Sequence, residues 1–151
     1  MNKEVSIKEL SPLIKSKIDE GGEVYLQVKG GSMYPFFLDG KTIVCLSKIK
    51  GRFKKNQVVL FEKNGVYGLH RIINVHDDYL TTRGDALIQK ENVLKRDVIG
   101  IVTSFKTKKK EVTTNNFFYL CLVTLWRLTF ALRRAKLFFL RKVVKYGQPH
   151  S

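Results

Sequence analysis

Three side chains in separate short segments have the types needed for nucleophilic hydrolysis: Ser32, His70 and Asp85. Gly30 and Gly31 precede the serine, which allows a tight turn that exposes the hydroxyl together with its own amide N–H. A serine attacks at neutral pH when a nearby base takes its proton, and a histidine base needs an acceptor that fixes its tautomer. The set therefore predicts a nucleophile, a general base and an orienting carboxylate. Ser32 alone would equally fit a polar turn between strands.

The segments that must position these residues are short and of β type. Apolar and β-branched runs separated by turn residues occupy residues 24–30, 42–49, 57–64, 65–77, 79–84 and 96–106. Asp39-Gly40 and Asn64-Gly65 are hairpin signals, because both pairs tolerate the positive φ of primed turns. We therefore expect a mainly β fold, a small antiparallel barrel or folded sheet.

Helical patterns flank this β region. Val5 to Asp19 shows helical spacing, and Ser11-Pro12 predicts a helix that begins near residue 12. After the β region, apolar and basic residues alternate in a manner typical of one long helix or two shorter ones. The expected organisation is an N-terminal helical segment (1–22), a β-rich domain (23–106), a charged linker (107–116) and a basic apolar helical segment (117–147).

The charge of the chain is concentrated near its C-terminus. The 151 residues contain 28 Lys+Arg and 13 Asp+Glu, a formal net charge of +15. Residues 101–151 hold eleven of the basic residues and only one acid, Glu111, so this third carries +10. Two distant cysteines, Cys45 and Cys121, exclude a disulfide scaffold and a four-cysteine zinc site. No cofactor or metal is predicted.

The basic segment 117–147 admits several interpretations. A transmembrane anchor is disfavoured because the apolar run is short and Arg127 would cost about 2.5–3.5 kcal/mol at a membrane centre. An acidic partner such as nucleic acid is disfavoured by the absence of a helix-turn-helix or zinc module. A helical hairpin packed on its own domain or on a second copy is a further alternative. Binding to an anionic membrane surface accounts for both the aromatic and the basic residues.

Several short motifs in order resemble signal peptidase I and the wider serine peptidase superfamily that includes LexA-like self-cleaving repressors. The motifs are Gly31-Ser32-Met33-Tyr34-Pro35, Asp39-Gly40, Val58-Val59-Leu60-Phe61, His70-Arg71-Ile72 and Arg83-Gly84-Asp85. Bacterial signal peptidases usually have a lysine where His70 stands, and the histidine form resembles archaeal, endoplasmic-reticulum and sporulation-type members. The resemblance covers about residues 24–102 of this chain.

The resemblance implies a mostly β catalytic domain that hydrolyses peptide bonds without metal or cofactor. Ser32 would be the nucleophile, His70 the general base and Asp85 the residue that orients His70, with the Ser32 N–H in the oxyanion hole. The chain departs from the pattern at Gly30, Tyr34, Asn56-Gln57 and Ala86.

The sequence therefore predicts a serine endopeptidase that cleaves a protein or peptide precursor. The location that fits the chain best is cytoplasmic and peripheral to the membrane, and anchoring through the C-terminal segment is the alternative. A non-catalytic peptide-binding or regulatory module on the same fold is the competing function. A LexA-like repressor fragment is disfavoured, since no DNA-binding domain precedes residue 24.

Overall fold

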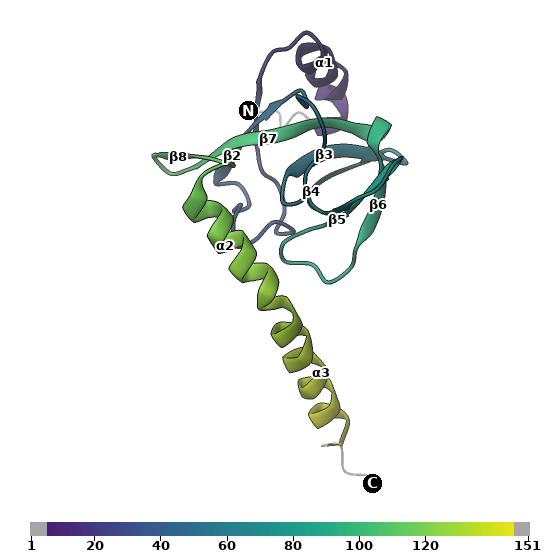
Figure 1. The fold of residues 1–151 in the computed structure, drawn as a ribbon, viewed down its shortest axis with the longest axis vertical. Coiled ribbons are helices and arrows are strands. Elements are labelled where there is room, and N and C mark those ends of the chain that lie inside the picture. Colours follow the sequence, from purple (N-terminus) through teal and green to yellow (C-terminus); the bar gives the residue numbers. More distant parts are fainter. Residues whose placement is uncertain (1–5, 147–151) are drawn as a thin grey trace. The chain divides into compact units, whose positions relative to one another are not determined.

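An eight-stranded antiparallel sheet forms the main part of the molecule (Figure 1). The computed structural model describes residues 6–146, so the outermost residues of the predicted segments 1–22 and 117–147 lie outside it. The strands are β1 (Val24–Gln27), β2 (Thr42–Ser47), β3 (Val58–Lys63), β4 (Val66–Val75), β5 (Tyr79–Arg83), β6 (Glu91–Leu94), β7 (Val98–Thr107) and β8 (Lys110–Thr113). A 3-10 turn, η1 (Lys95–Asp97), separates β6 from β7. The prediction of a mainly β fold is confirmed.

The sheet is folded but not closed. Its strands follow the order β1-β2-β7-β3-β4-β5-β6, with β8 paired to β7, so β1 and β6 are edges. Register shifts interrupt the ladders at Cys45/Leu46, Leu60/Phe61 and Ile72/Asn74. Such irregularities bend and twist strands locally, which lets one sheet wrap around a core without closing into a barrel.

The predicted hairpin at Asn64-Gly65 is confirmed. Lys63 pairs with Val66, and the two residues between them have φ values of 53° and 76°. These left-handed conformations match a two-residue hairpin turn, which asparagine and glycine adopt at little cost. Asp39-Gly40 instead lies at the base of a long loop between β1 and β2.

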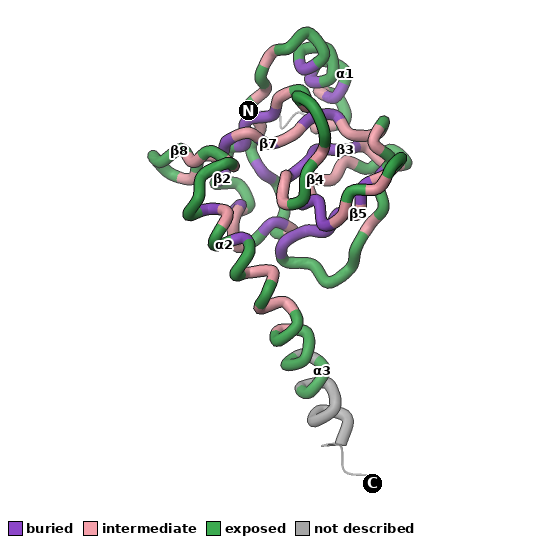
Figure 2. The backbone as a smooth tube through the Cα atoms, in the orientation of Figure 1, coloured by how far each residue is buried: buried purple, intermediate pink, exposed green. Residues whose placement is uncertain are grey.

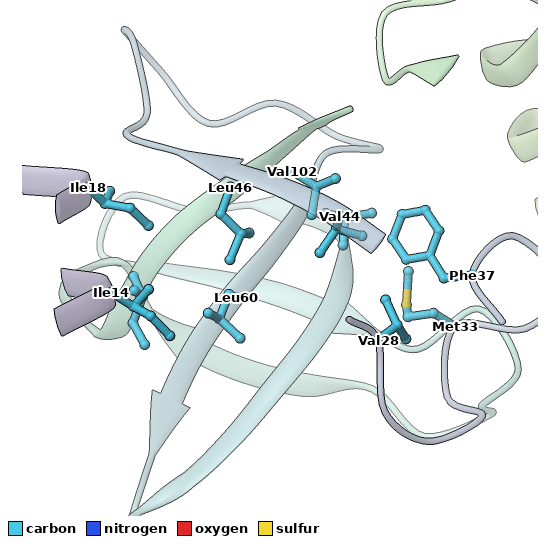
Figure 3. Packing of buried hydrophobic residues seen from close by; sticks show 11 residues of the cluster. Ile14, Ile18, Val28, Met33, Phe37, Val44, Leu46, Leu60 and Val102 are labelled. Atoms are coloured by element: carbon cyan, nitrogen blue, oxygen red, sulfur yellow. The ribbon is translucent and has the colours of Figure 1, made fainter. Parts of the chain in front are cut away.

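The main core gathers side chains from the sheet, the first helix and the β1–β2 loop (Figure 3). Val44, Leu46, Leu60 and Val102 come from strands, whereas Ile14 and Ile18 come from helix α1 (Ile7–Asp19). Figure 2 shows the buried stretches concentrated in the strands, with the turns exposed. The apolar face of α1 therefore covers part of the sheet.

Helix α1 begins earlier than predicted. Its N-cap is Ser6, whose side chain accepts a hydrogen bond from the Lys8 N–H, and Pro12 lies inside the helix. Proline removes one helical hydrogen bond, which normally disfavours an interior position. The first turns are stabilised by packing, because Ile7 and Leu10 contact the main core.

Residues 107–116 differ from the predicted charged linker. Lys110–Thr113 form β8, which pairs with β7 through a turn in which Lys108 has a φ of 61°. The Glu111 carboxylate of β8 accepts a hydrogen bond from Ser104 Oγ at 2.7 Å. The strand has a single apolar residue, Val112, so its sequence lacks the alternation that would have indicated it.

The C-terminal part, from Phe117, is a separate compact unit of two consecutive helices, α2 (Phe117–Leu128) and α3 (Phe130–Tyr146). The hydrogen bonds Thr129 N–H to Leu125 O and Arg133 N–H to Thr129 O continue the helical pattern across the junction. Of the two predicted alternatives, one long helix or two shorter ones, the structure has two helices, and α2 and α3 do not fold back as a hairpin. Within residues 6–146, no helix has the length and apolar character needed to cross a membrane.

Candidate active site

Ser32 lies in the loop that joins β1 to β2. The base of this loop is closed by hydrogen bonds from the Gly40 N–H to Val28 O (2.8 Å) and from the Gly30 N–H to Asp39 Oδ1 (2.8 Å). Gly30 has a φ of 82°, a left-handed conformation that a residue with a Cβ would adopt only under strain. The two glycines and the aspartate thus hold the loop in a fixed turn before the serine.

Two core side chains anchor the other side of the Ser32 turn. Met33 and Phe37 are 1% and 0% exposed and pack beside Val28 (Figure 3). The Phe37 N–H also donates to Met33 O at 3.0 Å, which makes the turn helical in form. Ser32 itself remains partly exposed and donates its N–H to no other group within residues 6–146. Its hydroxyl and amide are therefore available to a ligand.

The loop after β5 approaches the serine closely. The Ala86 N–H donates to Ser32 O at 2.9 Å, and a Cβ added to Gly84 would lie 2.6 Å from the same oxygen. A distance that short is not tolerated between these atoms, so the absence of a side chain at residue 84 sets the spacing between the two loops. The glycine of the Arg83-Gly84-Asp85 turn thus has a steric role.

We expect Gly84→Ala to lower the free energy of unfolding by about 1–3 kcal/mol, the usual cost of overpacking. The measurement is urea unfolding followed by circular dichroism. Gly31→Ala is the matched control, because a Cβ there meets nothing within 4 Å. Equal losses in the two variants would contradict the steric role of Gly84.

His70 lies in the middle of β4, opposite Val59 of β3. Its imidazole contacts the edge of the Phe61 ring, with centroids 5.6 Å apart, and its side chain is 15% exposed. Ser32 and His70 line the same cavity, which has a volume of about 270 Å³. No hydrogen bond joins the two side chains in the described part of the chain. Catalytic hydrogen bonds often tighten only when substrate is bound. The predicted nucleophile and base therefore meet at one cavity.

The surroundings of His70 favour its neutral form. Burial lowers the pKa of His70 from its usual value of 6.5, and the negative charges of Glu91 and Asp85 oppose this effect in part. A neutral imidazole can accept a proton, whereas an imidazolium cannot. The electrostatics are thus those of a general base at neutral pH.

Asp85 is bound by a buried arginine. Arg71 Nε donates to Asp85 Oδ1 at 2.8 Å, and Arg71 Nη2 donates to Asp85 Oδ2 at 2.6 Å. Arg71 is fully buried, donates from Nη1 to Asn56 O at 2.8 Å and stacks over the Phe36 ring at 5.3 Å. The Nδ1 atom of His70 has no hydrogen-bond partner among residues 6–146. Asp85, the carboxylate predicted to orient His70, thus forms a bidentate ion pair with Arg71, the residue that follows His70 in the sequence.

A different carboxylate lies beside His70. Glu91 Oε2 is 3.4 Å from His70 Nδ1, and Glu91 Oε1 is 3.7 Å from Lys63 Nζ. Both Glu91 and Lys63 line the cavity shared by Ser32 and His70. Sequence reasoning missed Glu91 because β6 is a four-residue strand without clear alternation, so nothing placed it next to β5.

An apolar groove continues from this cavity. It has a volume of about 660 Å³, and its walls include Leu10, Leu26, Val44, Leu60, Tyr67 and Leu69. Val28, Lys29, Tyr67, Gly68 and Leu69 line both spaces, so the groove and the Ser32–His70 cavity are contiguous. One wall is β1, an edge strand whose outer backbone groups have no strand partner in the sheet. The arrangement could hold an extended chain with apolar side chains.

Within the described residues, no cluster of three or more His, Cys, Asp or Glu side chains could hold a metal ion. Comparison with protein-family models and with curated proteins finds no match to this chain. The functional conclusions below therefore rest on the residues and their geometry.

Proposed function

We propose that this chain is a serine peptidase with Ser32 as nucleophile and His70 as general base. One observation carries the proposal: a serine with a free amide N–H and a partly buried histidine line the same cavity. The resemblance to signal peptidase I assigns the same two residues these roles. Peptide-bond hydrolysis by serine needs this pair and a donor for the oxyanion, and requires no metal.

In the proposed reaction, His70 accepts the Ser32 hydroxyl proton as Oγ bonds to the substrate carbonyl carbon. The carbonyl oxygen becomes an oxyanion that the Ser32 N–H stabilises, a donor worth about 2.7–4 kcal/mol when well aligned. His70 then gives its proton to the leaving amine as the C–N bond breaks. Water, deprotonated by His70, then attacks the resulting Ser32 ester. The bond between the acyl carbon and Oγ breaks, His70 returns the proton to Oγ, and the acid is released.

The contiguous groove supports a polypeptide substrate. Its apolar walls suit aliphatic side chains of an extended segment, and the open edge of β1 offers backbone hydrogen bonds to such a segment. A protein or peptide precursor with an apolar stretch beside its cleavage site fits this groove. The competing proposal, a non-catalytic peptide-binding module, would use the groove without the serine.

The test is labelling of the full-length chain by a fluorophosphonate, which reacts covalently with activated serines. We expect one adduct, located at Ser32 by mass spectrometry, and its formation should fail when His70 is replaced by Ala. Peptide binding in the groove without any adduct at Ser32 would support the non-catalytic alternative.

We also propose that the C-terminal unit binds an anionic membrane surface as a peripheral element at the cytoplasmic leaflet. Phe118, Leu122, Leu125 and Leu132 recur at helical spacing along α2 and α3 and are each more than half exposed. Residues 117–147 contain seven Lys+Arg and no acid. An exposed apolar stripe with basic neighbours lies stably in a headgroup region, and its uniform positive charge disfavours pairing with a second copy.

We expect the full chain to float with vesicles that contain anionic lipid and to remain unbound with neutral vesicles. Replacing Leu122, Leu125 and Leu132 by Ser should weaken binding by about tenfold or more, because each buried leucine contributes about 1.5–3 kcal/mol. Flotation on a density gradient measures the bound fraction.

The matched control replaces three exposed apolar residues of the other unit, Leu13, Val66 and Leu94, by Ser. This control should float like the unmodified chain. Equal flotation of both triple variants would refute membrane binding through α2 and α3.

A further inference from the structure

A histidine that acts as a general base needs a hydrogen-bond acceptor for its second ring nitrogen. In His70 this nitrogen is Nδ1, which has no such partner within residues 6–146. Nδ1 is inaccessible to solvent and makes no hydrogen bond within residues 6–146. A buried polar atom without a partner is uncommon and destabilising. The His70 side chain also lines the cavity that it shares with Ser32.

Glu91 is the carboxylate that can satisfy this nitrogen. Its Oε2 atom is 3.4 Å from Nδ1, slightly beyond a good hydrogen bond, and the Glu91 side chain is 34% exposed. A small rotation of this side chain would shorten the distance without moving the backbone. The other carboxylate oxygen faces Lys63 Nζ at 3.7 Å, so its charge is already partly balanced there.

The backbone around Glu91 is held in place from two sides. Thr82 Oγ1 donates to Glu91 O at 3.4 Å, and Lys63 Nζ donates to Asn92 O at 2.8 Å. Glu91 is also the first residue of β6 and pairs directly with Thr82 of β5. The carboxylate is therefore carried by a fixed strand, with only its side chain left to adjust.

Asp85 has a different role in this arrangement. Both of its oxygens accept hydrogen bonds from Arg71, which is fully buried. Each Asp85 oxygen could accept a second hydrogen bond, but within residues 6–146 His70 Nδ1 donates none to Asp85. Asp85 and Arg71 form a structural pair beside the site, while Glu91 Oε2 lies 3.4 Å from His70 Nδ1.

We propose that Glu91 is the positioning residue of His70, accepting a hydrogen bond from Nδ1–H so that the unprotonated Nε2 faces Ser32 as the base. The proposal rests on the peptidase function and names a carboxylate that the resemblance does not. During attack, the Ser32 proton moves to Nε2, the Nδ1 proton stays on Nδ1, and the Glu91 charge stabilises the imidazolium.

The first test measures the tautomer and the pKa of His70 and needs no substrate. In the full-length chain, ¹⁵N NMR should find neutral His70 with its proton on Nδ1, and Glu91→Ala should lower that fraction. Glu91→Ala and Glu91→Gln should both lower the pKa of His70, because each removes a negative charge that favours the imidazolium. The other charged groups near His70 or its cavity stay unchanged in these variants: Asp85, Arg71, Lys63 and Lys29.

The second test measures kcat, KM and their pH dependence with a peptide that the unmodified chain cleaves. Glu91→Ala should reduce kcat by about tenfold with little change in KM, since a positioned base contributes about 10²–10⁴ overall. Glu91→Gln, whose amide oxygen can still accept a hydrogen bond from Nδ1–H, should retain more of kcat than Glu91→Ala. In both variants the acid limb of the kcat/KM profile should move to lower pH, in step with the pKa of His70.

Glu62→Gln is the matched control, because Glu62 carries the same charge on β3 but pairs with Lys15 at 3.0 Å. It should leave the tautomer, the pKa and kcat unchanged. If Glu91→Ala alters neither the tautomer nor the pKa of His70, the proposal is refuted even where Ser32 is proven catalytic. If the NMR changes appear but no peptide is cleaved, the positioning contact stands and the peptidase function fails.

Discussion

Replacing Ser32 by Ala should reduce peptide hydrolysis about a million-fold, to the residual rate that the oxyanion donor and substrate binding supply. Ala lacks the hydroxyl that bonds to the substrate carbon, while the turn remains fixed by Met33, Phe37 and the Gly30–Asp39 hydrogen bond. His70→Ala should lose nearly as much. The double variant should lose no more than either single one, because the two residues act in one step.

The measurement is kcat for one peptide substrate under single-turnover conditions, with the folded state checked by circular dichroism. Ser47→Ala, at the end of β2 and outside the cavity, is the matched control and should keep full activity. Additive losses for Ser32 and His70, or hydrolysis that persists in Ser32→Ala, would rule out a shared nucleophile and base.

Arg71→Met should lower the free energy of unfolding by about 3–5 kcal/mol. The substitution removes the guanidinium that binds both oxygens of Asp85 and leaves that carboxylate buried without its counter-charge. The double variant Arg71→Met/Asp85→Leu should recover much of the loss, since replacing a whole buried pair by apolar side chains is often nearly neutral. Urea unfolding of Arg71→Met, Asp85→Leu and the double variant gives the coupling between the two residues.

The matched control for this pair is the exposed Lys15–Glu62 ion pair, at 3.0 Å. Lys15→Met should change the free energy of unfolding by less than about 1 kcal/mol, as is usual for surface pairs. If Arg71→Met is equally mild, or if the double variant is less stable than Arg71→Met alone, the pair does not have the structural role assigned here.

Local patterns in the sequence were sufficient for most of the sheet. The strands β2, β3, β4, β5 and β7 have apolar or β-branched residues in runs bounded by turn residues, and all were predicted close to their observed bounds. The Asn64-Gly65 turn was predictable because only residues tolerant of positive φ fit a two-residue hairpin. These features depend on residues that are near one another in the chain.

The missed features depend on packing or on distant partners. β6 and β8 have four residues each and few apolar side chains, so they form because β5 and β7 supply hydrogen bonds. Helix α1 includes residues before Pro12 because Ile7 and Leu10 contact the core. Asp39-Gly40 closes the loop between β1 and β2 through the Gly30 N–H instead of forming a hairpin.

The sequence by itself determined the types and order of the candidate residues: a serine after two glycines, a histidine in a strand and an aspartate in a turn. It could not determine which carboxylate would lie beside His70. Successive residues of a strand point to opposite faces, so His70 and Arg71 face different surroundings. The register of β4, β5 and β6 places Asp85 beside Arg71 and Glu91 beside His70. Only the pairing of three strands in space decides that assignment, because the residues involved are separated in the chain by turns of differing length.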